Sequence, residues 1–270
     1  MSINPSLTSS ILNSSKKYQQ YYTWLNWLIL AIAVVSTFFD DIVSSWLALL
    51  VLVVELIALL LKCLAKNKKD LGQHCSRISI LSNGLGINNA VAESYLATQI
   101  TNAEVTSEPK FRVDCYYNSA DEIGPKRFKD ILTESCFWTT TLYKKAYIST
   151  IKFFFAYIVV YILVLFFSVE WSYIRENIPF DKIMILAISA APLKDMLTDS
   201  FQLRKASNEL KRIDVYLNES ERETNEIILA FCDYSVATSN TPLIPEKIYR
   251  DNQSNLNSLW KARIENNKTV

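Results

Sequence analysis

The sequence of 270 residues is poor in several residue types on which catalytic and metal sites depend. Its one histidine, His74, excludes any metal site or catalytic triad that needs two imidazoles. Four glycines are too few for a glycine-rich phosphate loop, and five cysteines without paired spacing do not form a disulfide framework. A net charge of +1 argues against a general nucleic-acid binder, which should carry a basic excess. We therefore expect no catalytic residue, no metal, no cofactor and no direct binding of DNA or RNA.

What the sequence does contain is apolar residues gathered in four blocks. The second block, 42–61, carries one charge, Glu55, and has the length that a helix needs to cross a hydrocarbon core of about 30 Å. The third, 153–169, is almost free of polar residues, and neither block leaves a polar face for solvent. The first block, 24–39, is shorter, and the fourth, 183–193, has only 11 residues and spans a membrane only if the more polar range 178–197 is included. Together the four blocks predict insertion into a membrane.

The charges around the blocks predict the orientation. Lysine and arginine residues gather where the blocks meet the long connections, whereas the two short turns carry mainly acids. By the positive-inside rule both turns face outwards and both termini are cytoplasmic. We predict an all-α membrane protein with four transmembrane helices in two hairpins and a helical cytosolic domain. Its parts are an N-terminal segment with the first hairpin (1–64), a cytosolic insert (65–147), the second hairpin (148–200) and a cytosolic C-terminal region (201–270).

The cytosolic parts carry helical patterns. Apolar spacing predicts helices over 87–103, 200–238 and 246–265, with the proline-containing segment 241–245 ending the second of these. Pro125 suits the first turn of a helix that runs unbroken into the third span and joins the cytosolic body to the membrane. No alternating pattern is long enough for a sheet of any size.

Short elements of the cytosolic parts resemble a known family. They are an acidic-aromatic-tyrosine element at Asp114–Tyr117, a helix that enters the third span at Cys136–Tyr147, and the C-terminal stretches Ile227–Cys232 and Pro242–Arg250. With the layout of two spans, insert, two spans and helical tail, they resemble the four-transmembrane effectors associated with SMODS-type nucleotide second-messenger synthetases of bacteria. The chain departs from the family's pattern at Cys115, where an aromatic residue is usual, and at Thr139, where an acid is usual.

The resemblance implies a membrane effector of a bacterial anti-phage system of the cyclic-oligonucleotide (CBASS-like) kind. Such a protein is a multi-pass homo-oligomer of the inner membrane and not an enzyme. Its cytosolic region senses a cyclic nucleotide or oligonucleotide messenger, and its spans permeabilise the lipid bilayer as a pore, which causes abortive infection. The alternative is a membrane-anchored receptor or scaffold without a pore, which binds a cytosolic protein partner.

Polar residues within the spans are candidates for a pore lining. Glu55 is placed where a carboxylate costs roughly 2.5–3.5 kcal/mol, so we expect it to face the bundle or a water-filled path. It either lines an oligomeric pore or is protonated and hydrogen-bonded to Asn26 or a tyrosine. Lys194 and Asp195 either gate the end of the fourth block or form an interfacial charge pair. The full set of candidates is Glu55, Asn26, Tyr157, Tyr161, Lys194 and Asp195.

Aromatic and basic residues of the cytosolic parts are candidates for a nucleotide site. An aromatic ring can stack on a base, and lysine or arginine can pair with phosphate. The candidates are Tyr116, Tyr117, Lys126, Arg127, Arg204 and Arg212. The alternatives are a packed aromatic turn for the tyrosines and anchoring to anionic lipid for the basic residues.

Overall fold

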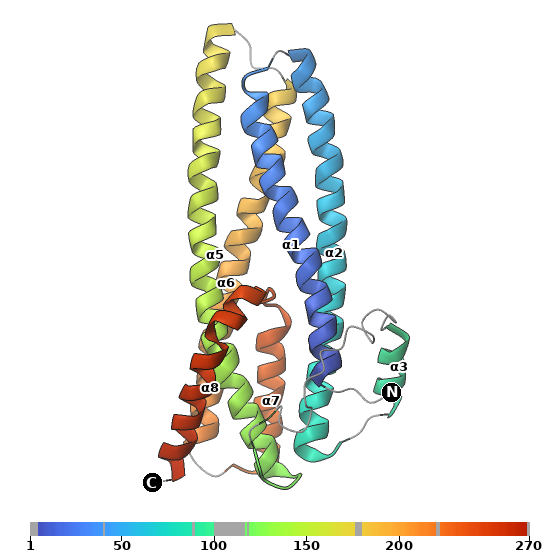
Figure 1. Ribbon diagram of the computed structural model, residues 1–270, viewed down its shortest axis with the longest axis vertical. Coiled ribbons are helices and arrows are strands. Elements are labelled where there is room, and N and C mark those ends of the chain that lie inside the picture. The colour runs from blue at the N-terminus through green and yellow to red at the C-terminus, as the bar shows by residue number, and fades with distance from the viewer. Residues whose placement is uncertain are drawn as a thin grey trace. The chain divides into compact units, whose positions relative to one another are not determined.

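The computed structural model describes residues 5–39, 41–87, 90–99, 117, 119–175, 180–219 and 222–268 (Figure 1). These residues are almost entirely helical, and none of them forms a strand. The helices are α1 (Pro5–Ser36), α2 (Asp41–Leu85), α3 (Ala90–Gln99), α5 (Pro125–Arg175), α6 (Phe180–Asn218), α7 (Thr224–Ser239) and α8 (Glu246–Lys268). The prediction of an all-α protein is confirmed.

The boundaries of three predicted helices are close to those observed. Pro125 begins α5, which continues without a break to Arg175 as predicted. The final helix, α8, begins at Glu246, directly after the segment 241–245. Helix α3 lies inside the predicted range 87–103.

The prediction of one helix over 200–238 is wrong, because α6 ends at Asn218 and α7 begins at Thr224. The start of α7 is stabilised locally. The Glu226 carboxylate accepts a hydrogen bond from the backbone N–H of Glu223 at 3.0 Å, which forms one half of a capping box. Such a cap satisfies backbone groups that a helix start leaves open, so a new helix begins although the apolar spacing runs on.

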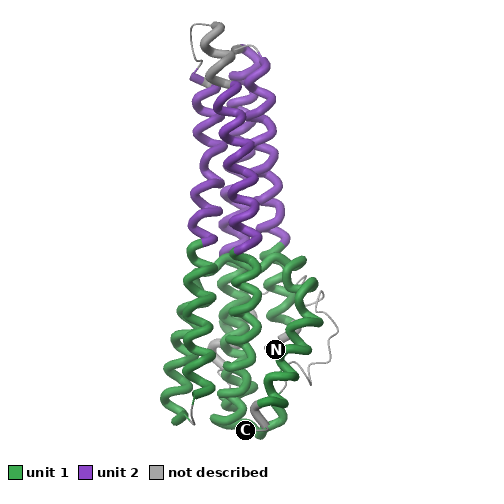
Figure 2. Tube along the Cα trace, turned by 90° about the vertical axis from the view of Figure 1, so that its left-hand side faces the viewer, with its two compact units in different colours: residues 1–16, 67–147, 201–270 green, residues 17–66, 148–200 purple. Residues whose placement is uncertain are grey.

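The chain divides into two compact units, each built from several chain segments (Figure 2). Unit 1 contains residues 1–16, 67–147 and 201–270, and unit 2 contains residues 17–66 and 148–200. Helices α1, α2, α5 and α6 each contribute residues to both units.

Unit 2 is a bundle of four helical segments with an apolar surface. Its small core consists of Ile29, Ala33, Ala48, Val51, Val54, Val164 and Ile185. Large apolar side chains also lie on the outside, including Trp46, Leu60 and Phe153, each more than half exposed. Among the described residues, two helices are long and apolar enough to span a membrane, over Ile42–Leu85 and Pro125–Phe167. Only 17% and 11% of their most apolar stretches are buried, whereas the core helix of a soluble protein is mostly buried.

Unit 1 has a core of the kind found in soluble helical proteins. Helices α2, α5, α6 and α7 supply its buried side chains, including Ile80, Phe128, Leu132, Leu203, Leu210, Ile213, Ile227 and Phe231. Helices α2 and α5 approach each other closely at Gly84, where an added Cβ would lie 2.9 Å from the Cα of Phe128. The backbone N–H of Gly124 donates to the Gly84 carbonyl at 2.8 Å, which fixes the start of α5 against the end of α2.

Side chains of α2 hold the C-terminal end of α7. Three donors, four residues apart and therefore on one face of α2, bond to carbonyl oxygens near the end of α7. The pairs are Lys69 with Ser239 at 3.0 Å, Gln73 with Thr238 at 2.9 Å, and Arg77 with Ser235 at 2.8 Å. The last carbonyls of a helix have no partner inside it, and a helix C-terminus favours nearby cations. The contacts therefore satisfy α7 and orient it on α2.

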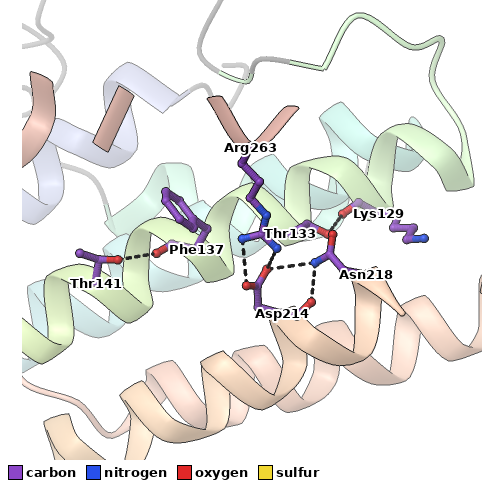
Figure 3. A network of polar contacts seen from close by, with 7 residues as sticks. All are labelled: Lys129, Thr133, Phe137, Thr141, Asp214, Asn218 and Arg263. Carbon is purple, nitrogen blue, oxygen red and sulfur yellow. Dashed lines mark hydrogen bonds and ion pairs between the residues drawn. The ribbon is translucent and has the colours of Figure 1, made fainter. Parts of the chain in front are cut away.

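A bidentate ion pair holds α8 against α6 (Figure 3). The Arg263 guanidinium donates to both carboxylate oxygens of Asp214, at 2.9 and 3.0 Å, and Asn218 donates to the same carboxylate. Arg263 also lies over the Phe137 ring of α5, 5.4 Å from its centroid. The planar guanidinium thus joins three helices, which a lysine ammonium at this position would not do equally well.

We expect Gly84→Ala to destabilise the protein by about 1–3 kcal/mol, because the new methyl group would overlap Phe128 in a packed core. Thermal unfolding of the detergent-solubilised full chain measures the effect. Gly124→Ala is the matched control, since a Cβ there meets no atom closer than 4.0 Å. Equal melting temperatures for the two variants would contradict the packing described above.

Candidate functional site

The first two segments of unit 2 form a hairpin whose register sets Asn26 level with Glu55. The Ser44 hydroxyl donates to the Ser36 carbonyl at 3.2 Å, so these two residues lie opposite each other. Asn26 lies ten residues before Ser36 in α1, and Glu55 lies eleven residues after Ser44 in α2. At a rise of 1.5 Å per residue, both distances along the helix axis are about 15–17 Å. Asn26 and Glu55 are therefore at the same depth of the bundle.

A chain of polar contacts leads from this level to α6. Lys62 donates to the Asp195 carboxylate at 2.6 Å, and the Tyr22 hydroxyl donates to the same oxygen at 2.5 Å. Lys62 also lies over the Tyr22 ring, 5.6 Å from its centroid. The side chains of Tyr22 and Asn26 are within hydrogen-bonding distance, and Glu55 is within electrostatic range of Tyr22, Lys62 and Asp195. We call these five residues (Tyr22, Asn26, Glu55, Lys62 and Asp195) the polar cluster.

Two oxygen atoms of the polar cluster are buried without a hydrogen-bond donor among the described residues. They are Asn26 Oδ1 and Glu55 Oε2. The Asn26 residue is only 4% exposed. A buried acceptor without a donor costs a few kcal/mol, and hydrocarbon offers no water to replace the missing bond. The polar cluster therefore lacks a donor at the level of Asn26 and Glu55.

Two tyrosines of α5 bond to the backbone of α6. The Tyr157 hydroxyl donates to the Ser189 carbonyl at 2.8 Å, and the Tyr161 hydroxyl donates to the Leu186 carbonyl at 3.2 Å. Pro192 lies inside α6 and has no N–H for the carbonyl four residues earlier, so the helix is weakened in this region. The Tyr157 ring, which is fully buried, also packs against Trp27 with centroids 5.2 Å apart. These hydroxyls tie α5 to the weakened part of α6.

The six candidates for a pore lining thus fall into three groups. Asn26, Glu55 and Asp195 belong to the polar cluster, Tyr157 and Tyr161 bond to α6, and Lys194 is exposed. Sequence reasoning missed Tyr22 as a member of the site, and Lys62, although it shares a stripe of α2 with Glu55, was not among the six candidates. The seven-residue spacing of Lys62 from Glu55, which places both on one stripe of α2, was the available signal.

The candidates for a nucleotide site lie in separate places of unit 1. Tyr116 is outside the described residues, and Tyr117 packs against the core of unit 1. At the start of α5, Lys126 donates to the Asp121 carboxylate at 3.2 Å and Arg127 to the Asp121 backbone carbonyl at 2.8 Å. The bond from Lys126 lowers the pKa of Asp121 below its usual value.

The two candidate arginines of α6 differ in their surroundings. Arg204 is exposed, whereas Arg212 pairs with Glu209 at 3.0 Å and with Asp233 at 3.5 Å. Arg212 also lines a cavity of about 130 Å³ between α6 and α7. The Ser207 hydroxyl donates to the Thr140 carbonyl, and this register sets Arg204 about 25 Å along the helix axes from Lys126. The five described candidates therefore do not form one site.

A larger cavity of about 310 Å³ lies between α2 and α3 in unit 1. Its lining includes Lys68, His74 and Tyr95, with Leu71 and Leu96 as the apolar part. The volume is at the lower end of the range for small-molecule sites, about 300–1,000 Å³. None of the nucleotide-site candidates lines it. The cavity could not be found from the sequence because α2 and α3 supply its residues without a common motif.

No protein-family model, curated protein or solved structure matches this chain. The resemblance to the four-transmembrane effectors stays a prediction.

We expect Lys62→Met to lower the free energy of unfolding by about 0.2–1 kcal/mol, because Asp195 loses the Lys62 ammonium and keeps only the Tyr22 hydroxyl as a donor. The exchange Lys62→Asp with Asp195→Lys should recover most of this loss. Equilibrium unfolding in mixed detergent micelles, read as a double-mutant cycle, measures the coupling. Lys194→Met removes the neighbouring exposed lysine and is the control. Additive effects of the Lys62 and Asp195 changes would contradict the pairing.

Proposed function

We propose that the chain is a four-span inner-membrane effector of a bacterial anti-phage system, which senses a cyclic nucleotide or oligonucleotide messenger and permeabilises the membrane as a homo-oligomer. The observation that carries the proposal is the polar cluster, in which ionisable residues of α1, α2 and α6 meet within the apolar unit 2, with Glu55 Oε2 buried and the side chains of Lys62 and Asp195 42% and 31% exposed. Ionisable residues within membrane segments are costly and commonly mark ion or solute pathways. In this proposal α1 and α6 also cross the bilayer, and both termini are cytoplasmic.

Two further observations support the proposal. The outward apolar side chains of α2 and α5 in unit 2 suit contact with lipid, because in water such a surface would favour aggregation. Helix α5 belongs to both units without a break, so a rearrangement of unit 1 on binding the messenger has a continuous element through which to act on the spans. A messenger opens the pore only if it binds the open arrangement more tightly than the closed one.

Leakage from liposomes tests the pore directly. The purified full chain is reconstituted into anionic liposomes loaded with a fluorescent dye, and cyclic dinucleotides, trinucleotides and tetranucleotides are added in turn. We expect dye release with one class of messenger and none with the matching linear nucleotides. Dye retention with every cyclic nucleotide would overturn the pore.

A span exchange separates the pore from the scaffold alternative. All four spans are replaced by a neutral membrane anchor that keeps unit 1 at the membrane. Growth arrest on co-expression with a messenger synthetase should disappear if the spans form the pore. Growth arrest that survives the exchange favours the receptor or scaffold, which needs the spans only as an anchor.

Within unit 1, we propose that Arg204 contacts messenger phosphate. Both residues are exposed, but Arg212 is already paired with Glu209 and Asp233, whereas no described acid forms an ion pair with Arg204. A charge-assisted hydrogen bond contributes about 1.5–3 kcal/mol, so Arg204→Ala should weaken messenger binding about tenfold or more. Arg212→Ala is the matched control and should change the affinity by less than threefold. Calorimetric titration of the messenger found by leakage measures both, and equal affinities for Arg204→Ala and the unchanged protein would refute this role.

A further inference from the structure

The level of Asn26 and Glu55 in unit 2 holds two buried oxygen acceptors to which no described group donates. Asn26 Oδ1 and Glu55 Oε2 are both buried without a donor among the described residues. The hairpin register sets the two residues at one depth, and both approach Tyr22. The Asn26 carbonyl oxygen and the Glu55 carboxylate oxygen cannot bond to each other, because neither carries a proton, and the Asn26 amide N–H groups do not donate to Glu55 Oε2 either.

The donors that surround these oxygens are engaged elsewhere. From α1, Tyr22 donates to Asp195 of α6, and from α2 the Lys62 ammonium does the same, two helical turns away from Glu55. From α5, the hydroxyls of Tyr157 and Tyr161 donate to carbonyls of α6. Asp195 is itself an acceptor. None of the groups that face Glu55 from these four helices therefore donates a hydrogen bond to Asn26 Oδ1 or to Glu55 Oε2.

We propose that the closed bundle binds one proton here, held on the Glu55 carboxyl group and donated in a hydrogen bond to Asn26 Oδ1. The proton comes from solvent water and forms the O–H bond of the carboxylic acid. One proton satisfies both oxygens, because Glu55 Oε2 becomes the donor and Asn26 Oδ1 its acceptor. It also removes a negative charge from a region where an unpaired charge is costly. The hydrogen bond joins α1 to α2 inside the bundle.

The proton site deepens the function proposed above, and its effect on the pore rests on that function. In an open, water-filled pathway the Glu55 carboxylate is hydrated and needs no proton. The closed form therefore binds one proton more than the open form, so acid stabilises the closed form and a rise in pH favours opening. For one proton the ratio of open to closed forms changes at most about tenfold per pH unit.

Infrared spectroscopy of the full chain in lipid nanodiscs tests the proton site without any messenger. At neutral pH we expect a carbonyl-stretch band of a protonated carboxyl group, which is absent in Glu55→Gln. In Asn26→Leu the band should move to the position of a carboxylic acid without a hydrogen-bond acceptor. Asp195→Asn is the matched control and should leave the band in place. Melting curves of each variant show whether it is folded.

A folded wild-type protein without the band, or a band that survives in Glu55→Gln, would overturn the proton site. A bound metal cation in place of the proton would also overturn it, and would appear as a sodium- or potassium-dependent melting temperature without the band. If the band is present but every messenger leaves the dye inside the liposomes, the proton site is supported and the pore is refuted. Leakage without the band refutes the proton site and keeps the pore.

The leakage assay gives a second readout for Glu55→Gln. The glutamine amide donates to Asn26 Oδ1 at every pH, so this variant should keep the bundle closed. We expect its messenger-induced leakage to be at least about tenfold lower than that of the unchanged chain. Between pH 6 and 8 the leakage of the variant should not depend on pH, whereas that of the unchanged chain should rise with pH because the open form releases one proton. The control is Leu56→Ile. Leu56 follows Glu55 in the sequence but lies on the outward face of α2, so this variant should show the same leakage as the unchanged chain.

Discussion

The constraint on which unit 2 depends is that every polar group inside an apolar bundle must find a partner in the protein. Most of the polar cluster satisfies this rule, since Asp195 accepts from both Tyr22 and Lys62. The tyrosines of α5 likewise donate to carbonyls of α6 near Pro192. The exception is the level of Asn26 and Glu55, where two oxygens share no donor. A bound proton, as proposed above, would supply the missing donor at this level.

Unit 1 meets the same constraint differently, since it places charged side chains at its edges and apolar ones in its core. Donors of α2 satisfy the end of α7, and the Arg263–Asp214 pair fixes α8 on α6. Where acids already neutralise a basic residue, as Glu209 and Asp233 do for Arg212, little charge is left for a phosphate. Both arginines are exposed, but no described acid forms an ion pair with Arg204, which makes it the better candidate for a ligand contact.

Long, uniform segments were the most predictable part of the fold. The helix from Pro125 into the third apolar block was predicted because proline favours a first turn and nothing after it breaks the helix. The end of α6 at Asn218 was not predicted, because the apolar spacing continues past it and the capping box of Glu223 and Glu226 decides the restart of α7. Glu55 and Asn26 could be singled out by composition, whereas Tyr22 joined them only through contacts with Asp195, far away in the sequence.

The sequence by itself determined the helical class, the apolar blocks and the rarity of charge within them, because these properties depend on composition and on local periodicity. Tertiary structure decided which polar side chains meet. The register of the α1–α2 hairpin sets Asn26 level with Glu55, and the packing of α6 brings Asp195 to Lys62. The Lys62–Asp195 contact joins residues 133 positions apart, and no local pattern encodes a partner at that separation. The missing donor at Glu55 is a property of the packed bundle, which no single segment contains.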